Sequence, residues 1–213
     1  MAPGSEESCL LWSSIREKRM GKKRFIKEYL EPIVIAILIA LFIRTFVVQA
    51  FKIPSSSMEP TLQVGDYILV TKFLYGVRIP YTSAKFFQFA KPQRGDVVVF
   101  IFPKDRSKDF IKRVIATEGE KIEIIQNKIY VNDKLINDPW GSFERKELSG
   151  HLSFLENVGP AVVPTGSLFV LGDNRHNSQD SRFWGFVDVD KVRGKALYIY
   201  WSKDKNRIGN GIK

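Results

Sequence analysis

An apolar stretch at residues 32–51, interrupted only by Arg44, Thr45 and Gln49, constrains the fold of this 213-residue chain more than any other feature. Twenty residues in an α-helix span about 30 Å, which is the thickness of the hydrocarbon core of a bilayer. The stretch predicts a single transmembrane helix at residues 29–51. Arg44 lies near one end of this helix, where its long side chain can reach the lipid headgroups.

Basic residues predict the orientation of this helix. Those that precede it are Arg16, Lys18, Arg19, Lys22, Lys23, Arg24 and Lys27. By the positive-inside rule, we expect residues 1–28 to form a cytoplasmic basic segment and residues 52–213 to lie on the other side of the membrane. A cleaved signal peptide with its exit site at Val48-Gln49-Ala50 is the alternative, although the basic flank is unusually long for one.

Composition limits the classes of function. With 44% hydrophobic and 26% charged residues, the chain is expected to form a globular domain with a packed core. A single cysteine and two histidines exclude an intramolecular disulfide and a structural Cys/His metal site, and we expect neither metal nor cofactor. The net charge is +10, but no nucleic-acid-binding motif accompanies it and the densest basic cluster precedes the apolar stretch. Membrane lipid, and not nucleic acid, is therefore the expected partner.

Beyond the apolar stretch, the pattern changes to short runs of Val, Ile, Tyr and Phe between turn residues, which predicts a mainly β fold. The expected strands are residues 67–71, 96–102, 121–125, 128–131, 168–171 and 196–201. Gln126-Asn127 and Asn132-Asp133 are expected hairpin turns. Residues 137–164 carry scattered Gly, Pro and charge, and we expect an irregular insertion there with no assigned role.

Three consecutive serines, Ser55-Ser56-Ser57, follow the apolar stretch. Taken alone they are typical of a polar linker, because serine is a common turn residue. Their flanks favour an ordered segment instead. Ile53-Pro54 holds the entering chain extended, Met58 and Leu62 supply apolar surface, and Pro60 stiffens the exit. A linker needs none of these features.

Two adjacent cations, Lys112 and Arg113, lie within an apolar run. In a strand, Lys112 would share its face with Phe110 and Val114, and Arg113 would share the opposite face with two isoleucines. One cation must therefore point into apolar surroundings or lie along a cleft. A lysine that snorkels at a sheet edge is the alternative interpretation. A buried lysine would lose its proton readily and could act as a base at neutral pH.

A dense polar run occupies residues 172–182 and, taken alone, is typical of a surface loop. His176 permits a Ser-His-Asp hypothesis, but its neighbours are better suited to fixing a loop by hydrogen bonds and ion pairs. Ser178 could hold a neutral lysine through one hydrogen bond. The residues able to form ion pairs there are Asp173, Asp180, Arg113 and Arg182.

Taken in order, the apolar helix, SSSMEPTLQVGDYILVTKFLYG, RGDVVVF, KRVI and GDNRHNSQDSRFWGFV resemble bacterial type I signal peptidases over about residues 27–201. The resemblance implies an antiparallel β catalytic domain at residues 52–213, anchored by one transmembrane helix in the cell membrane. It implies an enzyme that removes signal peptides from exported preproteins after Ala-x-Ala, with the export translocon as a further candidate partner. Residues 116–120 and His176 depart from the common pattern, which puts local loop geometry in doubt.

The resemblance also implies a role for each matching residue. Ser57 would be the nucleophile and Lys112 the general base, with the Ser55 hydroxyl in the oxyanion hole and Ser178 orienting the lysine. Asp173, Asp180, Arg113 and Arg182 would support the site, and the substrate would contact Phe51, Ile53, Pro54, Met58, Leu62 and Ile111. A specialised maturation peptidase and an inactive membrane-anchored scaffold are the alternatives. The presence of both Ser57 and Lys112 argues against the scaffold.

Overall fold

The computed structural model describes residues 26–75, 77–78, 85–86, 89–143 and 157–213. The chain divides into two compact units, Met1–Thr45 and Phe46–Lys213, each of which is described by itself. Most of the basic segment predicted at residues 1–28 lies outside the described residues.

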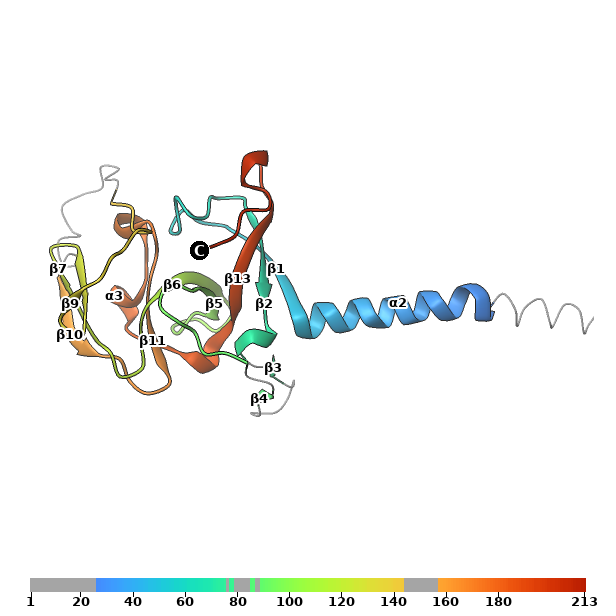
Figure 1. The fold of residues 1–213 in the computed structure, drawn as a ribbon, viewed down its shortest axis with the longest axis horizontal. Coiled ribbons are helices and arrows are strands. Elements are labelled where there is room, and N and C mark those ends of the chain that lie inside the picture. The colour runs from blue at the N-terminus through green and yellow to red at the C-terminus, as the bar shows by residue number, and fades with distance from the viewer. Residues whose placement is uncertain (1–25, 76, 79–84, 87–88, 144–156) are drawn as a thin grey trace, which may run out of the picture. The chain divides into compact units, whose positions relative to one another are not determined.

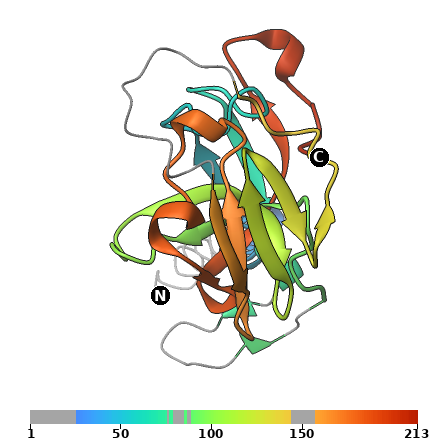
Figure 2. The same ribbon diagram turned by 90° about the vertical axis from the view of Figure 1, so that its left-hand side faces the viewer.

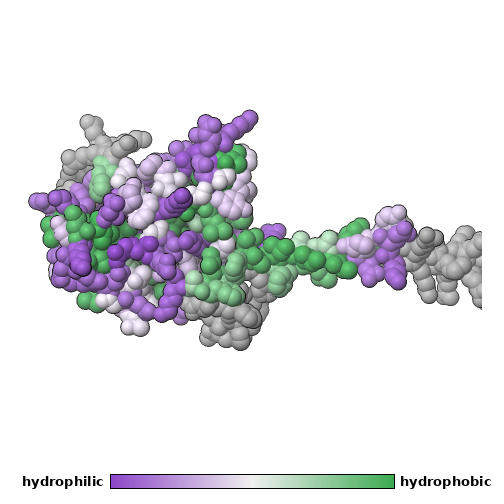
Figure 3. All heavy atoms as spheres, viewed as in Figure 1, coloured by the Kyte–Doolittle hydropathy of each residue, from purple (hydrophilic) through white to green (hydrophobic). Residues whose placement is uncertain are grey.

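The first unit is helical where it is described. It contains a π-helical turn, η1 (Ile26–Leu30), and the α-helix α2 (Glu31–Phe42), and a second π-helical turn, η2 (Ile43–Val47), follows. Pro32 stands in the first turn of α2, where the missing N–H costs no hydrogen bond. Hydrophobic residues cover the visible face of α2, and none of its residues is buried (Figure 3). Among the described residues, no helix is both long and apolar enough to cross a membrane. The transmembrane helix therefore stays a prediction.

The predicted helix extends too far at its C-terminal end. Val48–Lys52 forms strand β1, which pairs antiparallel with β2 (Tyr67–Thr71) from Val48 opposite Thr71 to Lys52 opposite Tyr67. A short apolar run fits a helix or a buried strand equally well by hydropathy, and here the pairing with β2 decides for the strand.

The second unit is mainly β, as predicted, and the pairings between its described strands are antiparallel (Figure 1, Figure 2). Its larger sheet has seven strands in the order β1-β2-β13-β5-β6-β11-β12. The strands not yet given are β5 (Val97–Ile101), β6 (Asp109–Thr117), β11 (Ser167–Leu171), β12 (Val187–Asp188) and β13 (Val192–Trp201). This order places β6 between β5 and β11.

A four-stranded sheet has the order β10-β7-β8-β9. Its strands are β7 (Lys121–Ile125), β8 (Lys128–Val131), β9 (Lys134–Leu135) and β10 (Val158–Val162). Gln126-Asn127 and Asn132-Asp133 have positive φ at all four residues, which is the signature of tight hairpin turns and confirms their prediction. The irregular insertion predicted at residues 137–164 is wrong in part, because β10 lies within it. Residues 144–156 of that insertion lie outside the described residues.

The remaining elements are short. A two-stranded sheet joins β3 (Val77–Arg78) to β4 (Lys85–Phe86). The described helical turns are η3 (Phe73–Tyr75), η5 (Arg175–Asn177), α3 (Ser181–Trp184), η6 (Val189–Lys191) and η7 (Lys205–Arg207). Of these, η5 lies within the polar run at residues 172–182, and α3 begins in it.

The core explains why a strand can bury two cations. In β5, Val97 and Val99 join one hydrophobic cluster, whereas Val98 and Phe100 join another, so both faces of the large sheet are covered there. The neighbouring strand β6 is buried from Lys112 to Ala116. Any charged side chain in that part of β6 must therefore find a partner or lose its charge.

Candidate active site

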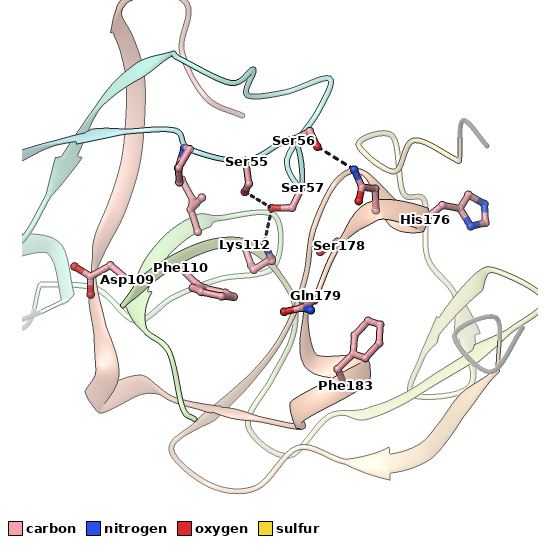
Figure 4. A pocket seen from close by; sticks show the side chains of 13 residues that line it. Ser55, Ser56, Ser57, Asp109, Phe110, Lys112, His176, Ser178, Gln179 and Phe183 are labelled. Carbon is pink, nitrogen blue, oxygen red and sulfur yellow. Dashed lines mark hydrogen bonds between the residues drawn. The ribbon is translucent and has the colours of Figure 1, made fainter. Parts of the chain in front are cut away.

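Strand β6 brings Lys112 to the serine segment that follows β1. Lys112 Nζ lies 2.6 Å from Ser57 Oγ, within hydrogen-bond distance, and Ser55 Oγ lies 3.4 Å from the same oxygen (Figure 4). Only 3% of Lys112 and 8% of Ser57 is exposed to solvent. The structure thus brings together the three residues predicted to carry the chemistry, although they come from different segments of the chain.

Burial changes the ionisation of Lys112. Desolvation lowers the pKa of its amine from 10.5 to about 8, because the charged form loses its hydration. The carboxylates of Asp180 and Asp173 oppose this effect, and the guanidinium of Arg182 adds to it. The Phe110 ring lies on the same side, with its centroid 5.6 Å from Nζ. At pH 7 about a tenth of the lysine would be neutral and able to accept a proton.

Arg113 is also buried, on the opposite face of β6. Its guanidinium forms a two-point ion pair with Asp173, with distances of 2.8 Å from Nε to Oδ1 and 2.7 Å from Nη2 to Oδ2, and neither side chain is exposed. Its Nη1 donates to the carbonyls of Gly95 and Lys213, and the Trp140 ring packs against it. Sequence reasoning required one buried cation, and the structure has two because Asp173 neutralises the second.

The polar run at residues 172–182 is folded against the serines. Asp180 pairs with Arg182 and accepts a hydrogen bond from the Gly172 backbone N–H. A Cβ on Gly172 would lie 2.1 Å from Ser178 Oγ and 2.4 Å from the Ser57 carbonyl oxygen, so only glycine allows this approach. The Ser178 hydroxyl is buried and has no hydrogen-bond partner among the described residues. Buried hydroxyls without a partner are few in folded proteins, so this one calls for an explanation.

Two asparagines that the sequence did not single out fix the serine segment. The Asn174 backbone N–H donates to the Ser57 carbonyl at 3.1 Å, and its side-chain amide donates to the Ser56 carbonyl at 3.2 Å. The Asn177 amide donates to Ser56 Oγ at 2.9 Å. Asparagine is common in loops, so nothing in the sequence distinguished these two from ordinary turn residues.

An open cavity of about 640 Å³ lies over the serine and lysine. It is lined by Pro54, Ser55, Ser56, Ser57, Asp109, Phe110, Ile111, Lys112, His176, Asn177, Ser178, Gln179 and Phe183. His176 is on its rim, where the imidazole meets the Phe143 ring edge-on. Within the described part of the chain, the Ser57 hydroxyl contacts Lys112 and Ser55 and not His176, so the geometry is not that of a Ser-His-Asp triad.

The residues predicted to contact substrate are divided by the structure. Pro54 and Ile111 line the cavity. Ile53, Met58 and Leu62 are instead buried in a hydrophobic cluster, and Phe51 packs against it. Met58 and Leu62 expose no surface that a substrate could touch, so the prediction of direct contact is not met for them. Their packing holds the serine segment in place.

No group of three or more His, Cys, Asp or Glu side chains that could hold a metal ion occurs in the described ranges. The reactive side chains that line the cavity include those of the serines and the lysine. A serine hydroxyl in contact with a buried amine of lowered pKa, at the floor of an open cavity, is the arrangement of a hydrolase that uses serine as its nucleophile.

The sequence comparisons define the family. Residues 26–201 match the model of "Signal peptidase, peptidase S26", and the chain belongs to this family of serine endopeptidases. Signal peptidase I of Pseudomonas aeruginosa is 33% identical over 223 residues, which cover 91% of this chain and 78% of that protein. Signal peptidase I of Aquifex aeolicus is 34% identical over 229 residues, which cover 83% of this chain and 85% of that protein.

A solved structure is also similar in part. The crystal structure of a signal peptidase I from Enterococcus faecalis matches with 30% sequence identity and a TM-score of 0.43, over 50% of this chain and 97% of that chain. A score of that size does not establish a common fold. The family membership of this chain rests on the sequence matches.

Proposed function

We propose that this chain removes N-terminal signal peptides from exported preproteins, with Ser57 as nucleophile and Lys112 as general base. The single observation that carries the proposal is the 2.6 Å contact between Ser57 Oγ and the buried Lys112 amine. The names of the relatives support the choice of substrate, since the matched proteins are signal peptidases.

The proposed reaction needs only these two groups to move protons. The neutral amine of Lys112 takes the proton of Ser57 as Oγ attacks the carbonyl carbon of the peptide bond. The resulting ammonium then protonates the leaving amine, and a water activated by the same amine hydrolyses the ester on Ser57. We propose that the Ser57 backbone N–H and the Ser55 hydroxyl, whose Oγ lies 3.4 Å from Ser57 Oγ, stabilise the oxyanion. Loss of one such donor typically costs about 10²–10³ in turnover.

The supporting residues would hold Ser57 and Lys112 in contact. The unpaired hydroxyl of Ser178 is available to orient the lysine amine. Asp173 neutralises Arg113 behind β6, and Asp180 pairs with Arg182 while holding the backbone of Gly172. We propose that these contacts position the nucleophile and base without touching the substrate.

An unpaired edge of β6 is a natural place for the substrate backbone. Pairing with β11 begins at Arg113, whereas residues 109–112 pair only with β5 among the described strands. An extended peptide could add as a strand along this edge, opposite Pro54 and Ser55. Side chains just before the cleaved bond would then meet Pro54, Phe110 and Ile111. We propose that these walls admit only small side chains and so give a preference for Ala-x-Ala.

The proposed location is the cell membrane. The apolar character of α2 and the basic residues that precede it favour a single-pass anchor with its N-terminus in the cytoplasm. The catalytic unit would then lie outside the cytoplasm, near membrane lipid and the export translocon. Protease added outside spheroplasts should digest the unit beyond Phe46 and spare the basic N-terminal segment. Protection of the catalytic unit would contradict this topology.

Cleavage of a precursor whose signal peptide ends in Ala-x-Ala tests the proposed activity. Purified wild-type protein should release the mature chain with the expected mass, whereas Ser57→Ala and Lys112→Ala should not. Lys112→Arg should fail as well, because a guanidinium stays protonated. Lys128→Ala, which alters an exposed lysine on β8, is the matched control and should retain activity. Appreciable cleavage by a folded Ser57→Ala or Lys112→Ala variant would contradict the proposal.

A further inference from the structure

The cavity has two walls of different chemistry on either side of Ser57 and Lys112 (Figure 4). The wall formed by Pro54 and β6 is largely apolar and includes the unpaired edge of that strand. We call it the strand wall. The opposite wall is polar and runs from η5 into α3. It is formed by His176, Asn177 and Gln179, with Phe183 at its end. We call it the loop wall.

Gln179 is a free hydrogen-bonding group of the loop wall. Its side chain points into the cavity, toward the space between Phe110 and Phe183 (Figure 4). The Asn177 amide is already engaged with Ser56 Oγ, whereas the Gln179 amide forms no hydrogen bond with any residue that the structure describes. A free carboxamide offers two donors and one acceptor, which suits the backbone of an extended peptide.

The charged groups differ between the walls as well. Asp109, on the strand wall, lies 3.3 Å from the guanidinium of Arg193. On the loop wall the one ionisable side chain is His176, which contacts Phe143 and makes no hydrogen bond with a described residue. His176 is therefore available to a polar or acidic side chain of a ligand bound along this wall.

The inference rests on the proposed function, because it assigns the two walls to the two sides of the cleaved bond. The residues of a signal peptide before the cleavage site are small and apolar, and match the strand wall. The residues after the cleaved bond must leave on the other side of Ser57, along the loop wall. We propose that Gln179 and His176 form the binding site for the first residues of the mature chain. Gln179 bonds their backbone, and His176 offers an imidazole N–H to polar or acidic side chains.

Two substrates with the same acyl part ending in Ala-x-Ala test the assignment of Gln179. One continues for five residues beyond the cleaved bond, and the other carries a p-nitroanilide in place of those residues. The ratio of kcat/KM for the peptide to kcat/KM for the anilide should fall about three- to ten-fold in Gln179→Ala, because one or two backbone hydrogen bonds are lost. Gln93→Ala, at an exposed glutamine outside the cavity, should keep the wild-type ratio.

A negative charge introduced at position 176 tests the assignment of His176. Peptides with Glu or Lys at the second position after the cleaved bond should be compared in wild-type protein and in His176→Asp. The variant should shift the preference from Glu toward Lys by about two- to five-fold, the scale of an exposed charge pair. An unchanged preference would overturn the role of His176.

Other outcomes bear on the whole inference. An equal loss on both substrates in Gln179→Ala, or a larger loss on the anilide, would show that the loop wall binds the signal peptide or only supports the fold, and would overturn the assignment. An unchanged ratio would overturn it too. If wild-type protein cleaved neither substrate, the proposed function would fail and the inference with it, which is a different result from a change in ratio.

Discussion

The buried amine of Lys112 makes a specific prediction about stability and pH. In the unfolded chain the lysine is protonated up to about pH 10.5. Folding must then either bury the charge or release the proton, and both cost free energy. Replacing Lys112 by methionine, which has similar length and no charge, removes this penalty. We therefore expect the difference in unfolding free energy between wild type and Lys112→Met to depend on pH in a defined direction.

The magnitude follows from the pKa of Lys112 in the folded protein, about 8, and its ordinary value of 10.5. Below pH 8 both states hold the proton, and the wild type carries the full penalty of about 3 kcal/mol. Between pH 8 and 10.5 the folded protein has lost the proton that the unfolded chain still binds, so the stability of the wild type rises with pH. Above pH 10.5 the penalty is gone. The carboxylates of Asp173 and Asp180 already limit its size.

Urea unfolding of both proteins at several pH values, in one detergent throughout, measures the difference in their unfolding free energies. The unfolding free energy of the wild type minus that of Lys112→Met should rise by about 2 to 3 kcal/mol between pH 7.5 and 10. Lys128→Met, at an exposed lysine on β8, is the matched control for the loss of one lysine from the chain. The same difference, measured for Lys128→Met, shows how much pH dependence any lost lysine produces. If the difference for Lys112→Met changes with pH no more than this, the reasoning is refuted.

Three further predictions concern the site. First, kcat/KM should rise with pH along a limb centred near pH 8 as Lys112 loses its proton, and a flat profile from pH 6 to 10 would contradict its role as base. Second, Gly172→Ala should abolish most peptide cleavage, since its Cβ would lie 2.1 Å from Ser178 Oγ; wild-type kcat would show that the loop can move aside. Third, Asp173→Ala should lower the free energy of unfolding by about 3–5 kcal/mol, because Arg113 is left buried without its partner; a loss below about 1 kcal/mol in urea unfolding would contradict this.

Local patterns predicted part of the fold. The strands at residues 67–71, 121–125 and 128–131 have the predicted bounds, because turn residues limit them and β-branched residues fill them. The order of the seven-stranded sheet depends on pairings between distant segments and could not be read from such patterns. Strand β1 was predicted as helix because its apolar residues continue the apolar stretch of α2 beyond Arg44 and Thr45. Strand β10 was missed because Gly159 and Pro160 stand inside it, and both are rare in strands.

The sequence also predicted part of the candidate site. Ser57 stood out because its flanks did not suit a linker, and Lys112 because it lies within an apolar run, although an edge lysine stayed possible there. The structure brings the two side chains into contact. Gln179 did not stand out, since a polar residue in a polar run carries no signal of its own. Met58 and Leu62 were expected to contact substrate, but apolar residues beside a nucleophile can line a pocket or fill the core. Only tertiary packing decides between these two roles.

The mass of the intact protein during turnover tests the central claim most directly. With an activated ester of a peptide ending in Ala-x-Ala, an acid-quenched reaction should contain protein heavier by the mass of the acyl group. Digestion should place that group on the peptide that contains Ser57, and Ser57→Ala should show no adduct. An adduct on any other residue, or cleavage by Ser57→Ala at the wild-type rate, would contradict the account.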